Sequence, residues 1–248
     1  GSQYTQLIAG RIREIGVFSE IVSHRISLKE IHKLNPKGII LSGGPESVYK
    51  KNTLKIDPNI LNSNIPVLGI CYGMQLIAQH FKGKVKTSNK SEFGNTQIKI
   101  FKGKIFKKIT RKELNVWMSH GDKVTKLPKG FKRIASSKNC AIAAIESIKD
   151  KKFGLQFHPE VTHTDNGSKI LEAFIKDICK CQAKWRAKNI VKKLVEEIRT
   201  KVGDKKVLLG ISGGVDSSVA AALLHKAIGK NLECIFVDNG LLRNCLLY

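Results

Sequence analysis

The stretch Val67-Leu68-Gly69-Ile70-Cys71-Tyr72-Gly73 decides the fold of the first part of the chain. A short apolar run, typical of a buried strand, leads into a cysteine between two glycines, and helical periodicity follows from Leu76 to Phe81. A strand that runs directly into a helix is the βα unit from which parallel sheets are built. The stretch therefore predicts an α/β fold with functional loops at the carboxyl ends of its strands.

The same alternation extends on both sides of this stretch. The apolar run from Gly38 to Leu41 ends in Ser42-Gly43-Gly44-Pro45, and a β-rich part at 97–101, 116–119 and 141–145 lies further on. We expect residues 1–178 to form one domain with a mainly parallel, open sheet. A closing helix is expected from apolar residues on one helical face, at Ile170, Leu171, Phe174, Ile175 and Ile178.

A second domain begins after a basic segment. Residues 179–206 carry many lysines, and Ile190, Leu194 and Ile198 repeat there at helical spacing, so we expect a helical linker. Residues 207–248 open with a buried strand, a turn, a helix and a further strand. This order predicts the first βαβ unit of another α/β domain.

Composition excludes several classes of protein. The chain has 248 residues, is 42% hydrophobic and can bury a substantial core. No apolar run approaches the roughly 18 residues of a membrane-spanning helix, so we expect a cytoplasmic protein with no membrane partner. The six cysteines are scattered, so we expect reduced thiols. The net charge of +24 is spread along the chain without an RNA-binding aromatic motif, so we expect no specific nucleic-acid partner.

Cys71 is the candidate nucleophile. Gly69-Ile70-Cys71-Tyr72-Gly73 has the spacing of the G-x-S-x-G nucleophile elbow, with sulfur in place of the hydroxyl. The glycines let the chain turn sharply enough to expose the side chain, and the following helix N-terminus favours a thiolate. A buried structural cysteine is the alternative if nothing else supports this interpretation.

Support comes from Gln156-Phe157-His158-Pro159-Glu160, an apolar strand that ends in a histidine with a carboxylate two residues later. A period of two places His158 and Glu160 on one side. We expect Glu160 to orient the His158 ring, whose other nitrogen deprotonates Cys71 and later protonates the leaving amine. Taken alone, His158 would more often be an ordinary surface or core histidine.

Ser42-Gly43-Gly44-Pro45 supplies a third element. The backbone N–H groups of Gly43 and Gly44 can approach a tetrahedral oxyanion, and the N–H of Tyr72 joins them. The alternative is an ordinary turn, which Gly-Gly-Pro would also suit.

These three motifs, in this order, resemble the class I, triad-type glutamine amidotransferases over residues 1 to about 178. The resemblance implies that a γ-glutamyl thioester forms on Cys71 and that ammonia is released. It also implies a glutamine site formed by Gln75, Ser119, His120 and Asp122. From the residues alone, Asp122 is a polar residue of unknown role.

The segment Ser212-Gly213-Gly214-Val215-Asp216-Ser217-Ser218 follows the first strand of the second domain and opens a helix. Glycine amides, serine hydroxyls and the helix dipole converge there on one anion site, although a plain strand-to-helix turn is an alternative. It is not a Walker A loop, which would require a lysine in register. The pattern resembles the PP-loop of ATP pyrophosphatases. This resemblance implies an ATP site at Ser212, Gly213, Gly214, Val215, Asp216, Ser217, Ser218 and Val237, with Asp216 as a Mg²⁺ ligand.

A glutaminase followed by a PP-loop on one chain resembles the GMP synthetase family, as does the motif Glu92-Phe93-Gly94. The resemblance implies that Mg-ATP adenylates XMP and that ammonia from glutamine converts the adenylate into GMP in purine biosynthesis, without a prosthetic group. It also implies that the complete enzyme is a homodimer. Relative to that family, the chain lacks a hydrophobic strand before Gly1 and departs from the pattern at 244–248, so we expect a fragment truncated at both ends.

Three alternatives stay open. An NAD synthetase also joins a glutaminase to a PP-loop, but its glutaminase is of the nitrilase type, so His158-Pro159-Glu160 counts against it. The chain could instead be a stand-alone glutaminase-type subunit. It could also be a non-catalytic remnant that binds glutamine or a partner without turnover, because a missing central strand can destroy the geometry while every catalytic side chain remains.

Overall fold

The computed structural model describes residues 4–44, 47–48, 55–185 and 187–236. Pro45, Val237 and the divergent segment 244–248 lie outside the described residues. The chain divides into two compact units, residues 1–184 and residues 185–248. The division falls inside the basic segment at 179–206. Among the described residues, no helix is long and apolar enough to cross a membrane.

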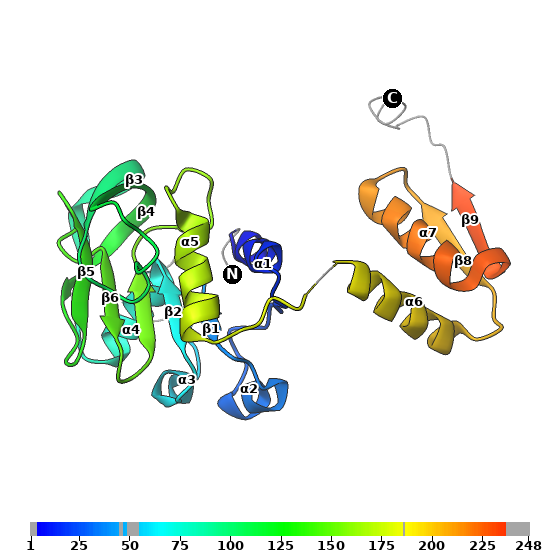
Figure 1. Cartoon of the computed structure of the whole chain (residues 1–248), viewed down its shortest axis with the longest axis horizontal. Helices are drawn as coiled ribbons and strands as arrows, with labels where there is room; N and C mark the ends of the chain where they lie inside the picture. The colour runs from blue at the N-terminus through cyan, green and yellow to red at the C-terminus, as the bar shows by residue number, and fades with distance from the viewer. Residues whose placement is uncertain (1–3, 45–46, 49–54, 186, 237–248) are drawn as a thin grey trace. The chain divides into compact units, whose positions relative to one another are not determined.

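A seven-stranded sheet forms the centre of the first unit (Figure 1). Its strands, in spatial order, are β1 (Ile39–Leu41), β2 (Val67–Ile70), β7 (Lys152–Leu155), β6 (Ala144–Ser147), β5 (Lys132–Ser137), β3 (Lys84–Ile100) and β4 (Glu113–Lys126). The strands β1, β2 and β7 pair in parallel, and the other neighbours pair antiparallel. The sheet is therefore mixed, and its parallel part is narrower than the sequence pattern indicates.

The register of the parallel strands places their carboxyl ends at one edge. Leu41 pairs with Gly69, and Ile70 pairs with Leu155. Loops that leave β1, β2 and β7 therefore begin side by side, as expected for functional loops in an α/β fold. The three segments that the sequence singles out as catalytic all begin at this edge.

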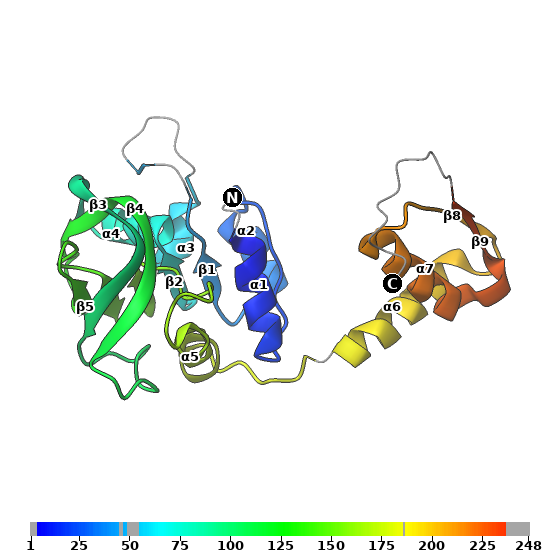
Figure 2. The ribbon, with the colours of Figure 1, turned by 90° about the horizontal axis from the view of Figure 1, so that it is seen from above.

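Helices cover both faces of the parallel strands. Val67 packs in one core cluster with Met74 of α4 (Tyr72–His80), whereas Leu68 and Ile70 pack in the other with Phe174. Figure 2 shows α1 (Thr5–Glu14) and α5 (Gly167–Glu172) on the side of β2 away from α4. The α/β class is confirmed. The remaining helical segments of this unit are α2 (Leu28–Leu34), α3 (Pro58–Asn62) and a π-helix over Ala173–Ile178, which continues α5.

The second unit contains one βαβ unit and a preceding helix. The strands β8 (Val207–Ile211) and β9 (Leu232–Phe236) pair in parallel, with α7 (Val215–Ile228) and a 3₁₀ turn (Gly229–Asn231) between them. Helix α6 (Ala187–Val202) belongs to this unit, because Arg199 donates hydrogen bonds to the carbonyls of Lys226 and Ala227. The helix expected as a linker is thus packed against α7.

Candidate active site

Cys71 stands at the tight turn between β2 and α4. Its backbone has φ 51° and ψ −107°, a conformation that residues with a side chain rarely adopt. Two glycines make the turn possible. A Cβ at Gly69 would collide with the Gly73 backbone, and a Cβ at Gly73 would collide with the Leu41 carbonyl oxygen. The turn has the shape of a nucleophile elbow.

The Cys71 sulfur meets polar groups from two neighbouring segments. Its thiol donates to the Ser119 carbonyl oxygen at 3.5 Å, and Gln156 Nε2 donates to the sulfur at 3.7 Å. The Cys71 amide donates to the Leu155 carbonyl at 2.7 Å. The elbow is therefore fixed to the end of β7, next to the segment that carries the candidate base.

His158 and Glu160 lie directly after that segment. His158 Nδ1 and Glu160 Oε1 are 2.8 Å apart, and both side chains are buried. Burial lowers the pKa of His158, but hydrogen bonds with Cys71 and Glu160 and the charges of both outweigh it and raise the pKa to about 9. A ring of this pKa can hold a proton taken from a neighbouring thiol at neutral pH.

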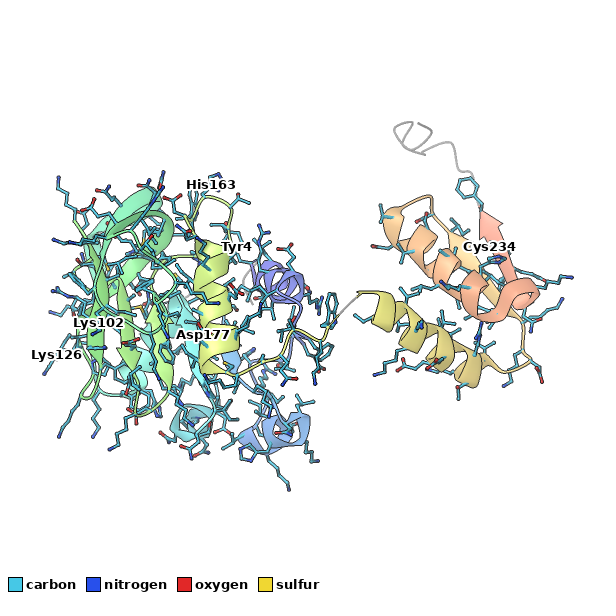
Figure 3. All side chains as sticks on the ribbon, in the orientation of Figure 1. Tyr4, Lys102, Lys126, His163, Asp177 and Cys234 are labelled. Atoms are coloured by element: carbon cyan, nitrogen blue, oxygen red, sulfur yellow. The ribbon has the colours of Figure 1, made fainter. Side chains whose placement is uncertain are left out.

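Several contacts fix the histidine in place. The His158 amide donates to the Trp117 carbonyl at 3.0 Å, and Thr164 Oγ1 donates to the His158 carbonyl at 2.6 Å. The Tyr4 ring lies 5.2 Å from the imidazole, and the His163 ring lies 4.9 Å from that of Trp117. Figure 3 labels Tyr4 and His163, which lie at the same end of the first unit. His158 is thus held by groups from the residue before α1, from β4 and from the loop before α5.

The glycines expected to form the oxyanion hole reach the same place. A Cβ at Gly43 would lie 3.1 Å from His158 Cε1 and 3.4 Å from Cys71 Cβ, and a Cβ at Gly44 would lie 3.9 Å from Tyr72 Cγ. A side chain at Gly43 would therefore crowd His158, whereas a Cβ at Gly44 would make only an ordinary contact. The structure therefore brings the three sequence motifs together.

The residues implied for glutamine binding separate into two groups. Gln75 Nε2 donates to the Asp122 carbonyl at 2.9 Å, and Ser119 contacts the Cys71 sulfur through its carbonyl. His120 instead faces Glu92, with Nε2 3.4 Å from a carboxylate oxygen, and burial lowers its pKa although Glu92 opposes that shift. His120 is part of a buried cluster beside the site.

Three contributors to this site were missed by sequence reasoning. Gln156 donates to the sulfur, Thr164 holds the backbone of the histidine, and Arg11 Nε donates to the Glu160 carbonyl at 3.1 Å. Gln156 adjoins the strand that leads to His158, so its position was a usable signal. Arg11 and Thr164 act through contacts across the fold, for which local spacing gives no signal.

The expected ATP site lies in the second unit. Gly213 has φ 76°, and Gly214 caps the start of α7. The hydroxyls of Ser212 and Ser217 lie 3.2 Å apart, and Ser218 Oγ donates to the Gly214 carbonyl at 3.0 Å. Val215, in the first turn of α7, is exposed. The exposed carboxylate of Asp216 in the same turn is a hard oxygen donor of the kind that Mg²⁺ takes together with phosphates.

Comparison with protein families gives the class. The model described as "Glutamine amidotransferase class-I" matches residues 1–178, and the chain belongs to this family. A second model, described as "NAD synthase", matches residues 186–237.

Individual curated relatives narrow the comparison from a family to one kind of enzyme. The chain is 54% identical over 243 residues to the GMP synthase (glutamine-hydrolyzing) of Macrococcus caseolyticus (strain JCSC5402), covering 98% of this chain and 47% of the relative. The enzyme of the same name from Staphylococcus aureus (strain MSSA476) has the same identity and coverage. The chain thus spans about half the length of these curated relatives. The resemblance to GMP synthetases is confirmed.

Solved structures agree on the fold. A Thermoplasma acidophilum protein, described as belonging to a GMP synthase, superposes with a TM-score of 0.66 and 32% identity, covering 78% of this chain and 94% of that one. A glutamine amido transferase from Methylobacillus flagellatus has a TM-score of 0.53 and 22% identity, covering 62% and 64% of the two chains. The amidotransferase type of sheet is therefore confirmed.

Proposed function

We propose that the first unit hydrolyses glutamine and that the ammonia serves the ATP-dependent amination of XMP to GMP. The observation that carries the first part is the buried pair of His158 Nδ1 and Glu160 Oε1 at 2.8 Å, beside the sulfur of Cys71 at a strained elbow. A histidine with one nitrogen held by a carboxylate and a raised pKa is equipped to act as base towards a neighbouring thiol.

The chemistry follows from the positions of these groups. His158 first takes the Cys71 thiol proton, and the resulting thiolate attacks the amide carbon of glutamine. The resulting oxyanion is stabilised by backbone N–H groups of Gly43, Gly44 and Tyr72. Return of the proton from His158 to the nitrogen breaks the C–N bond and releases ammonia, which leaves a γ-glutamyl thioester. Water, deprotonated by His158, then attacks the thioester, and glutamate leaves while the sulfur regains the proton.

For the glutamine itself, we propose Gln75, Ser119, His120 and Asp122 as the binding residues. The support is uneven. Gln75 and Ser119 have contacts that lead to the elbow, and the Asp122 carbonyl holds the Gln75 side chain. His120 is turned towards Glu92, so its contribution would be to the wall behind the site.

We propose that residues 212–218, together with Val237, bind ATP. Glycine amides and the start of α7 would hold phosphate oxygens, and Asp216 would hold Mg²⁺, which neutralises phosphate charge when it is bound. The support is the run of identity with GMP synthases over 98% of the chain, which includes this segment.

NAD synthesis is the second candidate, because the NAD synthase model matches residues 186–237. That match concerns the ATP-binding segment alone. Residues 1–178 match class-I glutamine amidotransferases, and relatives that combine both segments are GMP synthases. The combination favours GMP over NAD as the product.

We further propose that domains at 1–178 and 207–248 are joined by a linker at 179–206. We also propose that the complete enzyme is a homodimer and that it is located in the cytoplasm, where the purine nucleotide substrates would be found.

The test measures glutamate released from glutamine by the whole chain. Cys71→Ala should lower the rate by about 10⁴-fold or more, because the nucleophile is lost. The matched control is Cys179→Ala, which removes another buried thiol of the first unit and should leave the rate unchanged. Asp216→Asn should also leave it unchanged, because the proposed ATP site takes no part in hydrolysis.

Equal glutamate release from the parent chain and Cys71→Ala would refute the glutaminase assignment. In a complete enzyme, Cys71→Ala should still form GMP from XMP, ATP and added ammonia. Loss of that ammonia-driven synthesis in a folded Cys71→Ala variant would show that Cys71 is structural.

A further inference from the structure

A second cluster of buried reactive groups lies in the first unit, apart from the triad. Glu92 comes from β3, His120 from β4 and Cys140 from the turn between β5 and β6. All three residues are buried, and one ligand atom of each lies within 4.8 Å of the others. These side chains offer oxygen, nitrogen and sulfur, which is a donor set that zinc accepts.

The polar atoms of this cluster are not satisfied by the described protein groups. Glu92 Oε2 and both ring nitrogens of His120 are buried without a well-formed hydrogen bond to the described residues, although the Asp122 backbone and the Glu92 carboxylate lie near enough to oppose the fall in the pKa of His120. Glu92 Oε2 and His120 Nε2 lie 3.4 Å apart, close enough for charge attraction but not in hydrogen-bonding geometry. Buried groups of this kind are expected to have a partner, so their arrangement calls for one.

The spacing of the two atoms suits a metal ion. Two ligands that are each about 2.05 Å from a zinc ion and 3.4 Å apart subtend roughly 112° at the metal, near the tetrahedral angle. A thiolate about 2.3 Å from the same ion would lie roughly 3.6 Å from each of them. Since the three ligand atoms lie within 4.8 Å of one another, metal binding requires the sulfur to approach the other two by no more than about 1.2 Å.

Ser137 holds two of the proposed ligands in position through hydrogen bonds. Its hydroxyl donates to Glu92 Oε1 at 2.7 Å, which leaves Oε2 facing His120. The same hydroxyl accepts from the Cys140 amide at 2.9 Å. Hydrogen bonds that hold metal ligands in position are a regular feature of metal sites. One residue thus positions both the carboxylate and the segment that carries the thiol.

The buried cluster adjoins a hollow in the protein surface. A surface hollow is lined by Glu92, Ser137 and Asn139, so one side of the cluster is within reach of solvent. The Cys140 thiol now donates to the Ile142 carbonyl at 3.3 Å. On metal binding that hydrogen bond would break, and the thiol proton would leave to solvent as the thiolate–metal bond forms.

We propose that Glu92, His120 and Cys140 form a binding site for a zinc-like divalent ion, with water as the fourth ligand. The ion ties β3, β4 and the β5–β6 turn together. Because β4 also carries Ser119, which accepts from the Cys71 thiol, the ion stiffens the wall of the glutamine site. The site is separate from the proposed catalytic triad and from the proposed Mg²⁺ ligand Asp216.

The experiment titrates Co²⁺ and Zn²⁺ into the whole chain carrying Cys71→Ala, which removes the other buried thiol beside a histidine. We expect one ion per chain, a thiolate-to-cobalt absorption band, and a rise in melting temperature that grows with zinc concentration. Adding Cys140→Ser should abolish the band. Adding Cys179→Ser instead should leave both the band and the zinc affinity unchanged.

Ser137→Ala keeps all three ligands and removes only their orientation. It should weaken zinc binding by about 10-fold to 100-fold while the cobalt band is retained. This variant decides the matter if Cys140→Ser does not fold. Absence of a stoichiometric ion from the Cys71→Ala chain, a cobalt band that survives Cys140→Ser, or unchanged zinc affinity in Ser137→Ala would overturn the proposal.

Discussion

The two units differ in how completely they enclose their functional residues. In the first, the side chains of His158 and Glu160, which we propose as part of the catalytic triad, are almost fully buried. In the second, Val215 of the phosphate turn is 71% exposed, and Leu208 and Phe236 on the small sheet are 64% and 50% exposed. The first unit therefore presets its chemistry by packing, whereas the second holds its loop by short-range hydrogen bonds.

The two units also differ in how much burial strengthens their interactions. Burial strengthens the interaction between His158 and Glu160, because few water molecules compete for the same groups. In the second unit, alternate residues of β8 are exposed, so only one face of its two strands is covered by α7. A two-stranded sheet with one open face adds little stability. Substitutions in the first unit should therefore have the larger consequences.

The largest of these effects is expected for Glu160→Gln. The amide keeps the shape of the side chain but removes the charge that holds the His158 ring and stabilises its protonated form. We expect turnover of glutamine to fall by about 10²- to 10⁴-fold with little change in KM, because the carboxylate acts in the transition state. Steady-state kinetics measure the split, and a large rise in KM at unchanged kcat would contradict it.

Next in size is the effect of a methyl group at the elbow. In Gly69→Ala the new Cβ would meet the Gly73 backbone, so we expect the free energy of unfolding to fall by about 2–3 kcal/mol. Gly210→Ala is the matched change on β8, where a Cβ would meet nothing within 4 Å. It should change stability by less than about 0.5 kcal/mol. Denaturant unfolding of the two variants compares the units directly, and equal losses would refute the difference in packing.

A change of pH should have an effect that is smaller for each pH unit, about 1.4 kcal/mol. The folded pKa of His158 is raised to about 9, above its usual 6.5, so its protonation stabilises the fold fully below pH 6.5. That contribution is lost as pH rises through 9 and amounts to about 3 kcal/mol at most. The free energy of unfolding of the first unit should therefore fall over this window in the parent chain and fall less in Glu160→Gln. Denaturant unfolding at a series of pH values measures it, and identical pH profiles would contradict the raised pKa.

Much of the fold and of the candidate site could be predicted from local sequence. The spacing around Cys71 and the run from Gln156 to Glu160 are local patterns, and each follows a short, fully buried strand, β2 or β7. Since parallel strands end at one edge, these patterns were sufficient to predict that the triad would meet. The order of strand, helix and strand expected from residue 207 onward is likewise found in β8, α7 and β9.

Other features depend on which strands pair, and spacing does not specify this. The extent of antiparallel pairing follows from the order of β6, β5, β3 and β4. The cluster of Glu92, His120 and Cys140 arises because β3 and β4 align Glu92 opposite His120. The packing of α6 on α7 depends on Arg199, whose partners lie 27 and 28 residues later.

The most direct test of the central claim is to trap the covalent intermediate. The whole chain is mixed with glutamine, quenched in acid within a turnover, digested and examined by mass spectrometry. The account predicts one γ-glutamyl group on the peptide that contains Cys71, accumulation of that adduct in Glu160→Gln if deacylation becomes the slower step, and none in Cys71→Ala. Glutamate release without any adduct on Cys71, or an adduct on another cysteine, would contradict the assignment of Cys71 as the nucleophile.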